Sequence, residues 1–494
     1  MKARFPAPLA LLAIAALVAA CGSTALIPTD SALTAAPAGA TVDPSTPASG
    51  LAATPSDTPA APSDTPAASF DTPSVDPAVA ANWPTYHLNA TRTGFQVGFP
   101  APSSSISKKW SAKLDGAVYA EPLVVGGHVI AATENDTVYS LNSTTGAVLW
   151  SRHLGTPVRL STLPCGDIDP LGITGTPAYD AATGSLFAVA EITGPHHVLY
   201  ALDATTGAIR WWRTIDLAGD LAITHQQRPA LAVANGYVYI GLGGLAGDCG
   251  QYKGEEVGVP TSGKGNTISY RVPVSREGAV WSTGGPVIDS AGNLYVSTGN
   301  GSSTTKYDGS DSVVELSPTL TMLSRFAPAV WANDNANDLD LGSLSPALLP
   351  GGFVFIAGKR GYGYVLHQGA LGNIGGQVSS ANIGCAAFGA MAQDGSTVYI
   401  PCRTWIRQVT VSSTGQIKVG WITAAGKGGG PPVIGGGAVW SLYAAGGTLS
   451  ALNPATGGVL ASIGVGALPH FASPTLWGGM VLVGTMTGVV AVTP

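Results

Sequence analysis

Five cysteines are the residues whose type and spacing most clearly imply chemistry in this chain of 494 residues. The first, Cys21, closes the motif Val18-Ala-Ala-Cys21, which follows two basic residues near the N-terminus and an apolar run over 9–20. That run is too short to span a bilayer comfortably. The pattern predicts a bacterial lipoprotein signal peptide over residues 1–21, in which a diacylglycerol is attached to Cys21. An ordinary signal peptide followed by a chance cysteine is the alternative. Either pattern places the protein outside the cytoplasm, and the first anchors it to a bacterial membrane.

The other four cysteines are an even number in a chain expected to be exported, which predicts two disulfides. Cys385 and Cys402 flank a strand–turn–strand pattern centred on Asp394-Gly395, so they can face each other across a hairpin. Cys165 and Cys249 would then form the second pair, between loops of neighbouring repeats. Metal binding is the alternative, but no pair has the C-x-x-C spacing typical of zinc sites.

Acidic residues gather in one stretch that contains Asp334, Asp338 and Asp340. This cluster could bind calcium structurally, although its spacing differs from that of an EF-hand loop. The chain has no G-x-S-x-G elbow and no G-x-x-x-x-G-K-[ST] loop, so neither an α/β-hydrolase nor a P-loop nucleotidase is indicated. A net charge of −6 gives no electrostatic reason to expect nucleic acid as a partner.

The elements that would position these residues begin after a compositional boundary. Residues 22–82 are rich in Ala, Pro, Ser and Thr and contain no Lys or Arg. Such a segment buries too little apolar surface to offset its chain entropy, so we expect a disordered linker. From Trp83 onward, short apolar strands alternate with turns rich in Gly, Asn and Asp, which predicts an all-β domain over 83–494.

The strands recur as a repeat. A proline-led strand, a glycine turn and a second β-branched strand return about every 50 residues, which is near the usual length of a propeller blade. We therefore predict an eight-bladed β-propeller of four-stranded antiparallel blades, with seven blades as the alternative. The eight units begin at Pro122, Pro177, Pro229, Pro286, Pro346, Gly389, Pro432 and Pro474.

Three units share a sharper signature near their ends. Asn142-Ser-Thr-Thr-Gly-Ala-Val-Leu-Trp150 matches Asp203-Ala-Thr-Thr-Gly-Ala-Ile-Arg-Trp211, and 453–461 keeps all but the tryptophan. The Asn or Asp side chain can cap a tight turn, and the glycine accommodates its left-handed position. We expect the tryptophan to pack between adjacent blades.

The two ends of the domain are expected to close the ring. The last unit, Ser473 to Thr493, has room for three strands, whereas Ile106 to Leu114 reads as a lone outer strand. Pairing the two supplies the fourth strand and removes the exposed sheet edges of an open array.

These repeats resemble the propellers of the pyrroloquinoline-quinone (PQQ) repeat superfamily. The resemblance covers roughly residues 82–494 and extends to the opening Asn82-Trp83-Pro84 and Thr91-Arg-Thr-Gly94. The superfamily contains quinoprotein alcohol dehydrogenases and non-catalytic outer-membrane assembly lipoproteins. The resemblance therefore implies the fold and leaves two classes of function open.

For a dehydrogenase, the resemblance implies PQQ and calcium in the mouth of the central channel. Segments similar to those of the family would supply Glu191 and Asn300 as metal ligands and Asp338 as the catalytic base. Lys359, with Arg360 beside it, would provide the cation that contacts the quinone oxygens. Calcium would polarise the quinone carbonyl while the base takes the hydroxyl proton of the alcohol.

The chain also departs from that pattern. Cys165 lies where the family has two adjacent cysteines, but Gly166 replaces the second, so the disulfide that covers the quinone cannot form. Glu191 precedes Asn300 by two blades instead of one, and Asp248 is the acidic residue of the intervening blade, so it is the rival metal ligand. Trp281 is displaced by about two positions from the tryptophan expected beneath the quinone. No cytochrome domain is evident.

These departures favour an exported, lipid-anchored scaffold that holds a small ligand or a protein partner at the channel mouth. The alternative is a PQQ- and calcium-dependent alcohol dehydrogenase-like enzyme with an atypical site. We expect the long loop from Gly243 to Ser269 to contribute to the binding face. The enzyme hypothesis requires Asn300, Asp338 and Lys359 to converge at one end of the channel.

Overall fold

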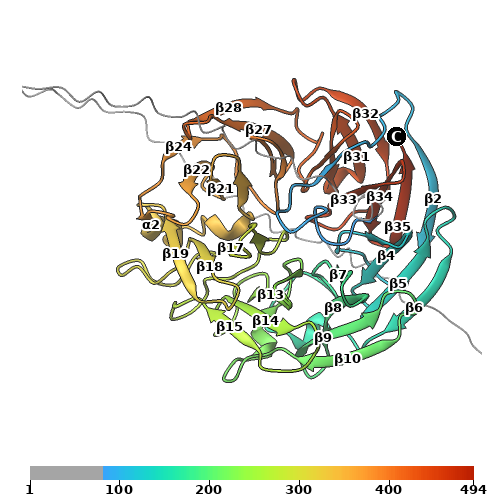
Figure 1. Ribbon diagram of the computed structural model, residues 1–494, viewed down its shortest axis with the longest axis horizontal. Coiled ribbons are helices and arrows are strands. Elements are labelled where there is room, and N and C mark those ends of the chain that lie inside the picture. The colour runs from blue at the N-terminus through green and yellow to red at the C-terminus, as the bar shows by residue number, and fades with distance from the viewer. Residues whose placement is uncertain (1–81) are drawn as a thin grey trace, which may run out of the picture. The chain divides into compact units, whose positions relative to one another are not determined.

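The computed structural model describes residues 82–494, which form eight small antiparallel sheets arranged as a ring (Figure 1). Each sheet is a blade in which the first strand lies nearest the channel and the fourth lies at the rim. The inner strands are buried, as in β3 (Leu123–Val125), whereas outer strands such as β6 (Val148–His153) are largely exposed. The prediction of an eight-bladed propeller is confirmed, and the seven-bladed alternative is wrong.

The first four blades follow the predicted units in chain order. Two of these blades have four strands and two have five, because β11 adds to blade 3 and β23 extends blade 4 at its outer edge. The remaining strands are β4 (His128–Thr133), β5 (Thr137–Asn142), β7 (Ala178–Asp180), β8 (Ser185–Ile192), β9 (His196–Asp203), β10 (Ile209–Thr214), β11 (His225–Gln226), β12 (Ala232–Ala234), β13 (Tyr237–Gly244), β14 (Glu255–Pro260), β15 (Ile268–Arg271), β16 (Val287–Ile288), β17 (Leu294–Ser297), β18 (Val313–Leu316), β19 (Met322–Ala327) and β23 (Asn373–Ile374).

The last four blades complete the ring, and the short strand β1 pairs with the first strand of blade 7. The strands are β1 (Phe95–Gln96), β2 (Ser107–Lys113), β20 (Ala347–Leu349), β21 (Phe353–Ala357), β22 (Tyr362–His367), β24 (Ser379–Asn382), β25 (Ala392–Asp394), β26 (Thr397–Cys402), β27 (Trp405–Val411), β28 (Ile417–Ile422), β29 (Val433–Gly435), β30 (Ala438–Tyr443), β31 (Thr448–Leu452), β32 (Val459–Gly464), β33 (Pro474–Trp477), β34 (Met480–Thr485) and β35 (Gly488–Thr493). Helical segments are short: α2 (Trp331–Ala336), η1 (Leu160–Thr162), η2 (Ala222–Thr224), η3 (Leu341–Ser343) and η4 (Ala444–Gly446). Within residues 82–494, no helix has the length and apolar character needed to cross a membrane.

The ring closes as the sequence predicts. Strand β2 pairs antiparallel with β35, with Trp110 opposite Ala491, and so becomes the fourth strand of blade 8. Because strands from both ends of the domain share one sheet, blade 8 cannot open without separating them.

The repeated turn signature holds neighbouring blades together. Asn142 caps its turn by accepting hydrogen bonds from the backbone N–H groups of Thr144 (2.9 Å) and Thr145 (3.0 Å). Gly207, at the matching turn of the next blade, has φ +70°, and a Cβ there would lie 2.5 Å from the ring of Trp150. The tryptophan of one blade therefore packs against the turn glycine of the next, which explains why this turn requires glycine. Further pairs of the same kind are Trp110 with Gly146, Trp211 with Gly263 and Trp421 with Gly457.

The two ends of the channel differ because the strands alternate in direction. In blade 1, β3 and β4 are joined at Gly126-Gly127, whereas β4 and β5 are joined six residues further on, at 134–136. We call the first end of the ring the turn face and the second the mouth face. Six residues of strand separate them, which is about 20 Å.

An N-terminal segment, residues 82–99, enters at the turn face and fills the channel at mid-depth. Asn82 accepts a hydrogen bond from the N–H of Gly126 (2.8 Å), and Trp83 forms an isolated bridge with Val124. The segment then contacts the first strands of blades on every side of the channel. Contacts across the ring are Pro84 with Tyr179, Thr85 with Leu231, Ala90 with Ile288, Thr93 with Gln393 and Gly94 with Ile434.

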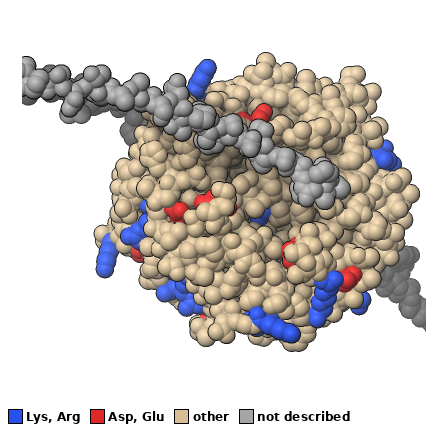
Figure 2. All heavy atoms as spheres, viewed as in Figure 1, with Lys and Arg blue, Asp and Glu red and all other residues tan. Residues whose placement is uncertain are grey.

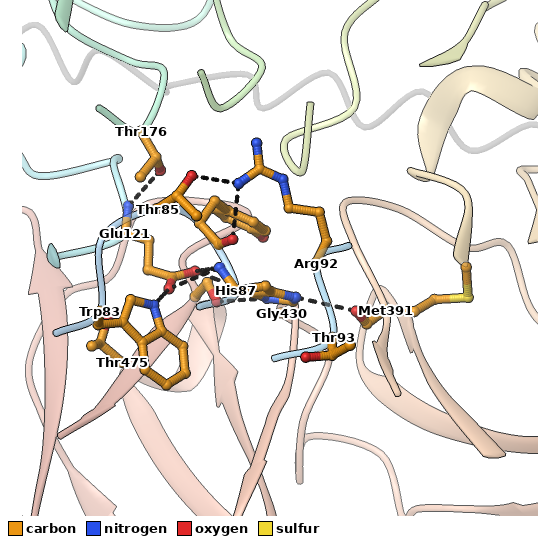
Figure 3. A network of polar contacts seen from close by, with 12 residues as sticks. Trp83, Thr85, His87, Arg92, Thr93, Glu121, Thr176, Met391, Gly430 and Thr475 are labelled. Carbon is orange, nitrogen blue, oxygen red and sulfur yellow. Dashed lines mark hydrogen bonds and ion pairs between the residues drawn. The ribbon is translucent and has the colours of Figure 1, made fainter. Parts of the chain in front are cut away.

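Two titratable side chains of this segment, His87 and Arg92, are buried in a polar network with Glu121 (Figure 3). Trp83 Nε1 and the backbone N–H of His87 (3.2 Å) donate to Glu121. Burial raises the pKa of Glu121 to about 8, and burial together with the nearby Arg92 lowers the pKa of His87 to about 3. Arg92 donates to backbone carbonyls, including that of Leu231 (2.8 Å). Glu121 and His87 are thus neutral at neutral pH, and the buried Arg92 guanidinium is stabilised by the hydroxyl and backbone carbonyl oxygens to which it donates.

Candidate functional site

A cavity of about 490 Å³ lies at the mouth face of the channel. Its residues follow the second strands of blades 3 to 6 or precede the first strands of several blades, so the repeat places them all at one end. We call it the charged cavity, since its lining includes Asp167, Arg228, Asp248, Asp338, Asp340, Lys359 and Arg403 beside Trp281, Asn300 and Phe471. Elsewhere charge is sparse: Figure 2 shows a face of the ring on which most side chains are neither acidic nor basic.

Asn300, Asp338 and Lys359 line this cavity together, as the enzyme hypothesis requires. Asn300 follows β17 and Lys359 follows β21, which are the second strands of adjacent blades, so both residues emerge at the mouth face. The Asn300 backbone N–H donates to Asp340 Oδ1 (2.5 Å). Lys359 Nζ lies 2.7 Å from Asp340 Oδ2 and 2.7 Å from Asp338 Oδ1. Asp340 therefore joins the two blades.

Burial and charge pairing set the protonation of this group. Burial raises the pKa of Asp340, although Lys359 and the N–H of Asn300 oppose that shift. Burial alone would lower the pKa of Lys359, but the carboxylates of Asp340 and Asp338 raise it. The lysine thus stays charged while it bridges one buried carboxylate and one whose side chain is 67% exposed.

Aromatic rings form one wall of the cavity. The Lys359 ammonium lies 5.6 Å from the Trp281 ring centroid, within the range of a cation–π contact. Trp281 and Phe471 have ring centroids 6.2 Å apart, and Phe471 has a left-handed backbone (φ +61°). The displaced position of Trp281 in the sequence therefore still brings its ring to the cavity.

The predicted disulfides are both present and both brace loops of the mouth face. Cys165 is bonded to Cys249, which directly follows the lining residue Asp248. Cys385 is bonded to Cys402, which directly precedes the lining residue Arg403. Cys165 itself lies behind the wall, since a Cβ on Gly247 would lie 3.4 Å from its sulfur.

Asp248 lies in the cavity wall, as the intervening-blade assignment requires, and its Oδ1 accepts a hydrogen bond from the Tyr252 hydroxyl (2.5 Å). The prediction of one long loop from Gly243 to Ser269 is wrong, because β14 occupies its centre. Its first part, the stretch 244–248, does line the cavity. The expected loop is shorter because Glu255–Pro260 pairs with β13 along its whole length.

Two other sequence-based candidates do not reach the cavity. Glu191 is buried in blade 2, where its Oε2 lies 3.2 Å from His197 Nε2, and His197 Nδ1 lies 2.7 Å from Asp216. Burial lowers the pKa of His197, but Glu191 and Asp216 outweigh it and raise that pKa to about 10. Glu191 is thus held in an internal ion pair and does not meet Asn300. Arg360 pairs with Asp334 outside the cavity wall.

Among the cavity residues that escaped the sequence analysis are Arg228, Arg403 and Phe471. Arg228 and Phe471 shortly precede a proline-led first strand, and Arg403 follows a second strand. Their place in the repeat register was thus the available signal, because such positions emerge at the mouth face in every blade.

The cavity suits an aromatic anion such as PQQ better than it suits an isolated metal ion. Arg228, Lys359 and Arg403 supply cations beside the flat rings of Trp281 and Phe471. Over residues 82–494, no three acidic, histidine or cysteine side chains of the cavity bring ligand atoms within 4.8 Å of one another. The Asn300 side-chain amide has no protein partner in that same range. Calcium would therefore need oxygen atoms of the organic ligand to complete its coordination.

Comparisons with known proteins agree with this architecture. The family model described as outer membrane protein assembly factor BamB matches residues 104–240. A polyvinylalcohol dehydrogenase of Sphingopyxis sp. (strain 113P3) is 26% identical over 299 residues, which cover 53% of this chain and 42% of that protein. The chain thus spans less than half the length of this curated relative.

Solved structures share the fold at low sequence identity. The quinohemoprotein alcohol dehydrogenase of Comamonas testosteroni superposes with a TM-score of 0.64 at 18% identity, over 85% of this chain and 83% of that one. BamB of Moraxella catarrhalis superposes with a TM-score of 0.54 at 16% identity, over 78% of this chain and 97% of that one.

The eight-bladed ring, its repeats and these matches define a class: the chain is a PQQ-repeat β-propeller. Within that class, the same fold serves an assembly factor and quinoprotein dehydrogenases. Function must therefore be argued from the charged cavity.

Proposed function

We propose that this protein is an exported, lipid-anchored propeller that binds a small organic anion in the charged cavity. The observation that carries the proposal is the cavity itself, which collects cations, carboxylates and aromatic rings from several blades at one end of the channel. Concave sites with a few convergent polar groups are typical of small-ligand binding. A protein partner seated on the mouth face is the other form that this scaffold hypothesis takes.

The location outside the cytoplasm rests on two features. The lipobox ending at Cys21 lies outside the described residues and remains a sequence-based expectation. Two disulfides in the propeller support export, because such bonds persist mainly in oxidising compartments.

A second candidate is a PQQ- and calcium-dependent alcohol dehydrogenase-like enzyme. Its specific support is the convergence of Asn300, Asp338 and Lys359, together with the dehydrogenase relative. When bound, PQQ would supply a two-electron acceptor and calcium would polarise it. Lys359 would orient the anion, the free amide of Asn300 would hold the cation, and the exposed carboxylate of Asp338 would accept a hydroxyl proton.

A calorimetric titration of PQQ into the purified protein, with and without calcium, tests these candidates. Saturable binding that requires calcium and weakens at least tenfold in Asn300→Ala supports the enzyme, and alcohol oxidation with an artificial acceptor is then measured. Asn453→Ala, at a turn-face cap outside the cavity, is the control and should bind as the parent does. PQQ binding with the same affinity in the presence and absence of calcium supports an anion-binding scaffold. No heat from a folded protein contradicts the cofactor hypothesis and leaves a protein-binding scaffold.

A further inference from the structure

A second hollow of about 270 Å³ adjoins the charged cavity between blades 6, 7 and 8. We call it the apolar compartment. Its walls are mainly hydrocarbon and glycine backbone, with Phe388, Leu442, Ala444, Pro469 and Ala472 among them. A Cβ on Gly430 would lie 2.7 Å from the Ala472 carbonyl oxygen, so close packing keeps side chains off that part of the wall.

Arg403 and Phe471 border both the apolar compartment and the charged cavity. Phe471 stacks on Phe388, with ring centroids 6.2 Å apart, so the boundary is aromatic on the apolar side. The two hollows therefore share one cation and one aromatic ring in their walls.

Arg403 is the cation of this site that lacks an anionic partner. Across residues 82–494 its guanidinium makes no ion pair or hydrogen bond, and its contact is with the ring of Phe388, 5.3 Å from the centroid. The other cations are engaged. Lys359 binds Asp338 and Asp340, while Arg228 lies 3.6 Å from Asp167 and 3.1 Å from His470.

We propose that the ligand of this propeller is an amphiphilic carboxylate whose head pairs with Arg403 and whose aliphatic chain fills the apolar compartment. The proposal rests on the ligand-binding role of the charged cavity and names the chemical class of the ligand. A guanidinium pairs with a carboxylate through two parallel hydrogen bonds, which orients the chain. Each methylene that leaves water for an apolar wall strengthens binding about fourfold.

The test compares octanoate, butanoate and 1-octanol by calorimetry on the purified protein. Octanoate should bind on the order of 100-fold more tightly than butanoate, because four more methylenes are buried. It should also bind about 10-fold more tightly than 1-octanol, which has the same chain without the charge. Equal affinity for octanoate and butanoate would overturn the role of the apolar compartment.

Variants separate the two parts of the site. Arg403→Gln should weaken octanoate about 10-fold and leave 1-octanol unchanged, whereas Arg403→Lys should recover part of the loss. Ala444→Phe should fill the apolar compartment and abolish octanoate binding. Ala182→Phe, in the exposed β7–β8 turn away from both hollows, is the matched control and should retain octanoate.

The outcomes also distinguish this proposal from the cofactor hypothesis. Ala444→Phe should leave any PQQ binding intact, because the charged cavity is untouched. Octanoate binding without PQQ binding would contradict the cofactor hypothesis and support the proposed site for an amphiphilic carboxylate. PQQ binding with no response to octanoate, or octanoate binding that ignores Arg403→Gln, would overturn the present proposal. Thermal unfolding of each variant shows that it is folded, and the parent ligand series decides the question if Ala444→Phe does not fold.

Discussion

Glu256 offers the sharpest test of the burial argument. It lies in β14 of blade 3, fully buried, and neither of its carboxylate oxygens has a hydrogen-bond partner among the described residues. Burial raises its pKa from an ordinary 4.5 to about 8, opposed by the charge of Arg92. The folded protein therefore keeps a proton on Glu256 at pH values where the unfolded chain has released it.

The sign and size of the effect follow from this difference. As pH rises through the interval between the two pKa values, the folded state binds more protons than the unfolded state, so stability falls. At 1.36 kcal/mol per pKa unit, the whole interval corresponds to about 5 kcal/mol, and about 4 kcal/mol of it develops between pH 5 and pH 8.5. Glu256→Gln removes the titration while keeping the shape of the side chain. The free energy of unfolding of Glu256→Gln, relative to that of the parent, should thus be about 4 kcal/mol greater at pH 8.5 than at pH 5.

Thermal unfolding at pH 5 and pH 8.5 measures this gain. For a domain of this length, with an unfolding entropy of roughly 2 cal/mol/K per residue, about 4 kcal/mol shifts the unfolding midpoint by about 4–5 °C. Asp394→Asn, which removes an exposed carboxylate at the end of β25, is the matched control. If Glu256→Gln shows no dependence on pH, the carboxylate is solvated or paired and the burial argument is refuted.

Two further substitutions test the packing between blades and the charge network of the cavity. Trp150→Ala should lower the free energy of unfolding by about 3–5 kcal/mol, measured by chemical unfolding, because the ring packs against Gly207 of the next blade. Trp212→Ala is the control, and it should lower that free energy far less because Trp212 is 64% exposed. Lys359→Met should cost about 3–5 kcal/mol at neutral pH by leaving the buried Asp340 carboxylate unpaired. That loss should shrink as the pH falls and Asp340 takes up a proton, so a loss that is the same at pH 5 and pH 8 would contradict the assignment.

The ring was predictable because each blade repeats the same local physics. A proline-led strand, a glycine turn and a β-branched strand recur in register, and the missing fourth strand of the last unit identifies the closing strand β2. The convergence of Asn300 and Lys359 was predictable for the same reason, since both follow second strands.

The rest of the site depends on contacts that the repeat does not encode. Glu191 follows a similar pattern, but His197 lies directly opposite it in the pairing of β8 with β9 and holds it inside the blade. Arg403 and Phe471 lie in connections whose sequences are not repeated, and they meet only because the ring brings distant blades together. Local resemblance therefore found the acids and the lysine but missed the residues that shape the cavity.

The path of the N-terminal segment has a consequence for how the domain would be displayed. Asn82 lies beside Gly126 on the turn face, while the charged cavity opens on the mouth face at the opposite end of the strands. The described chain therefore begins at the end of the ring opposite the cavity. If Cys21 carries a lipid as proposed, this attachment point leaves the mouth face unobstructed, so a ligand can reach the cavity from the surrounding medium.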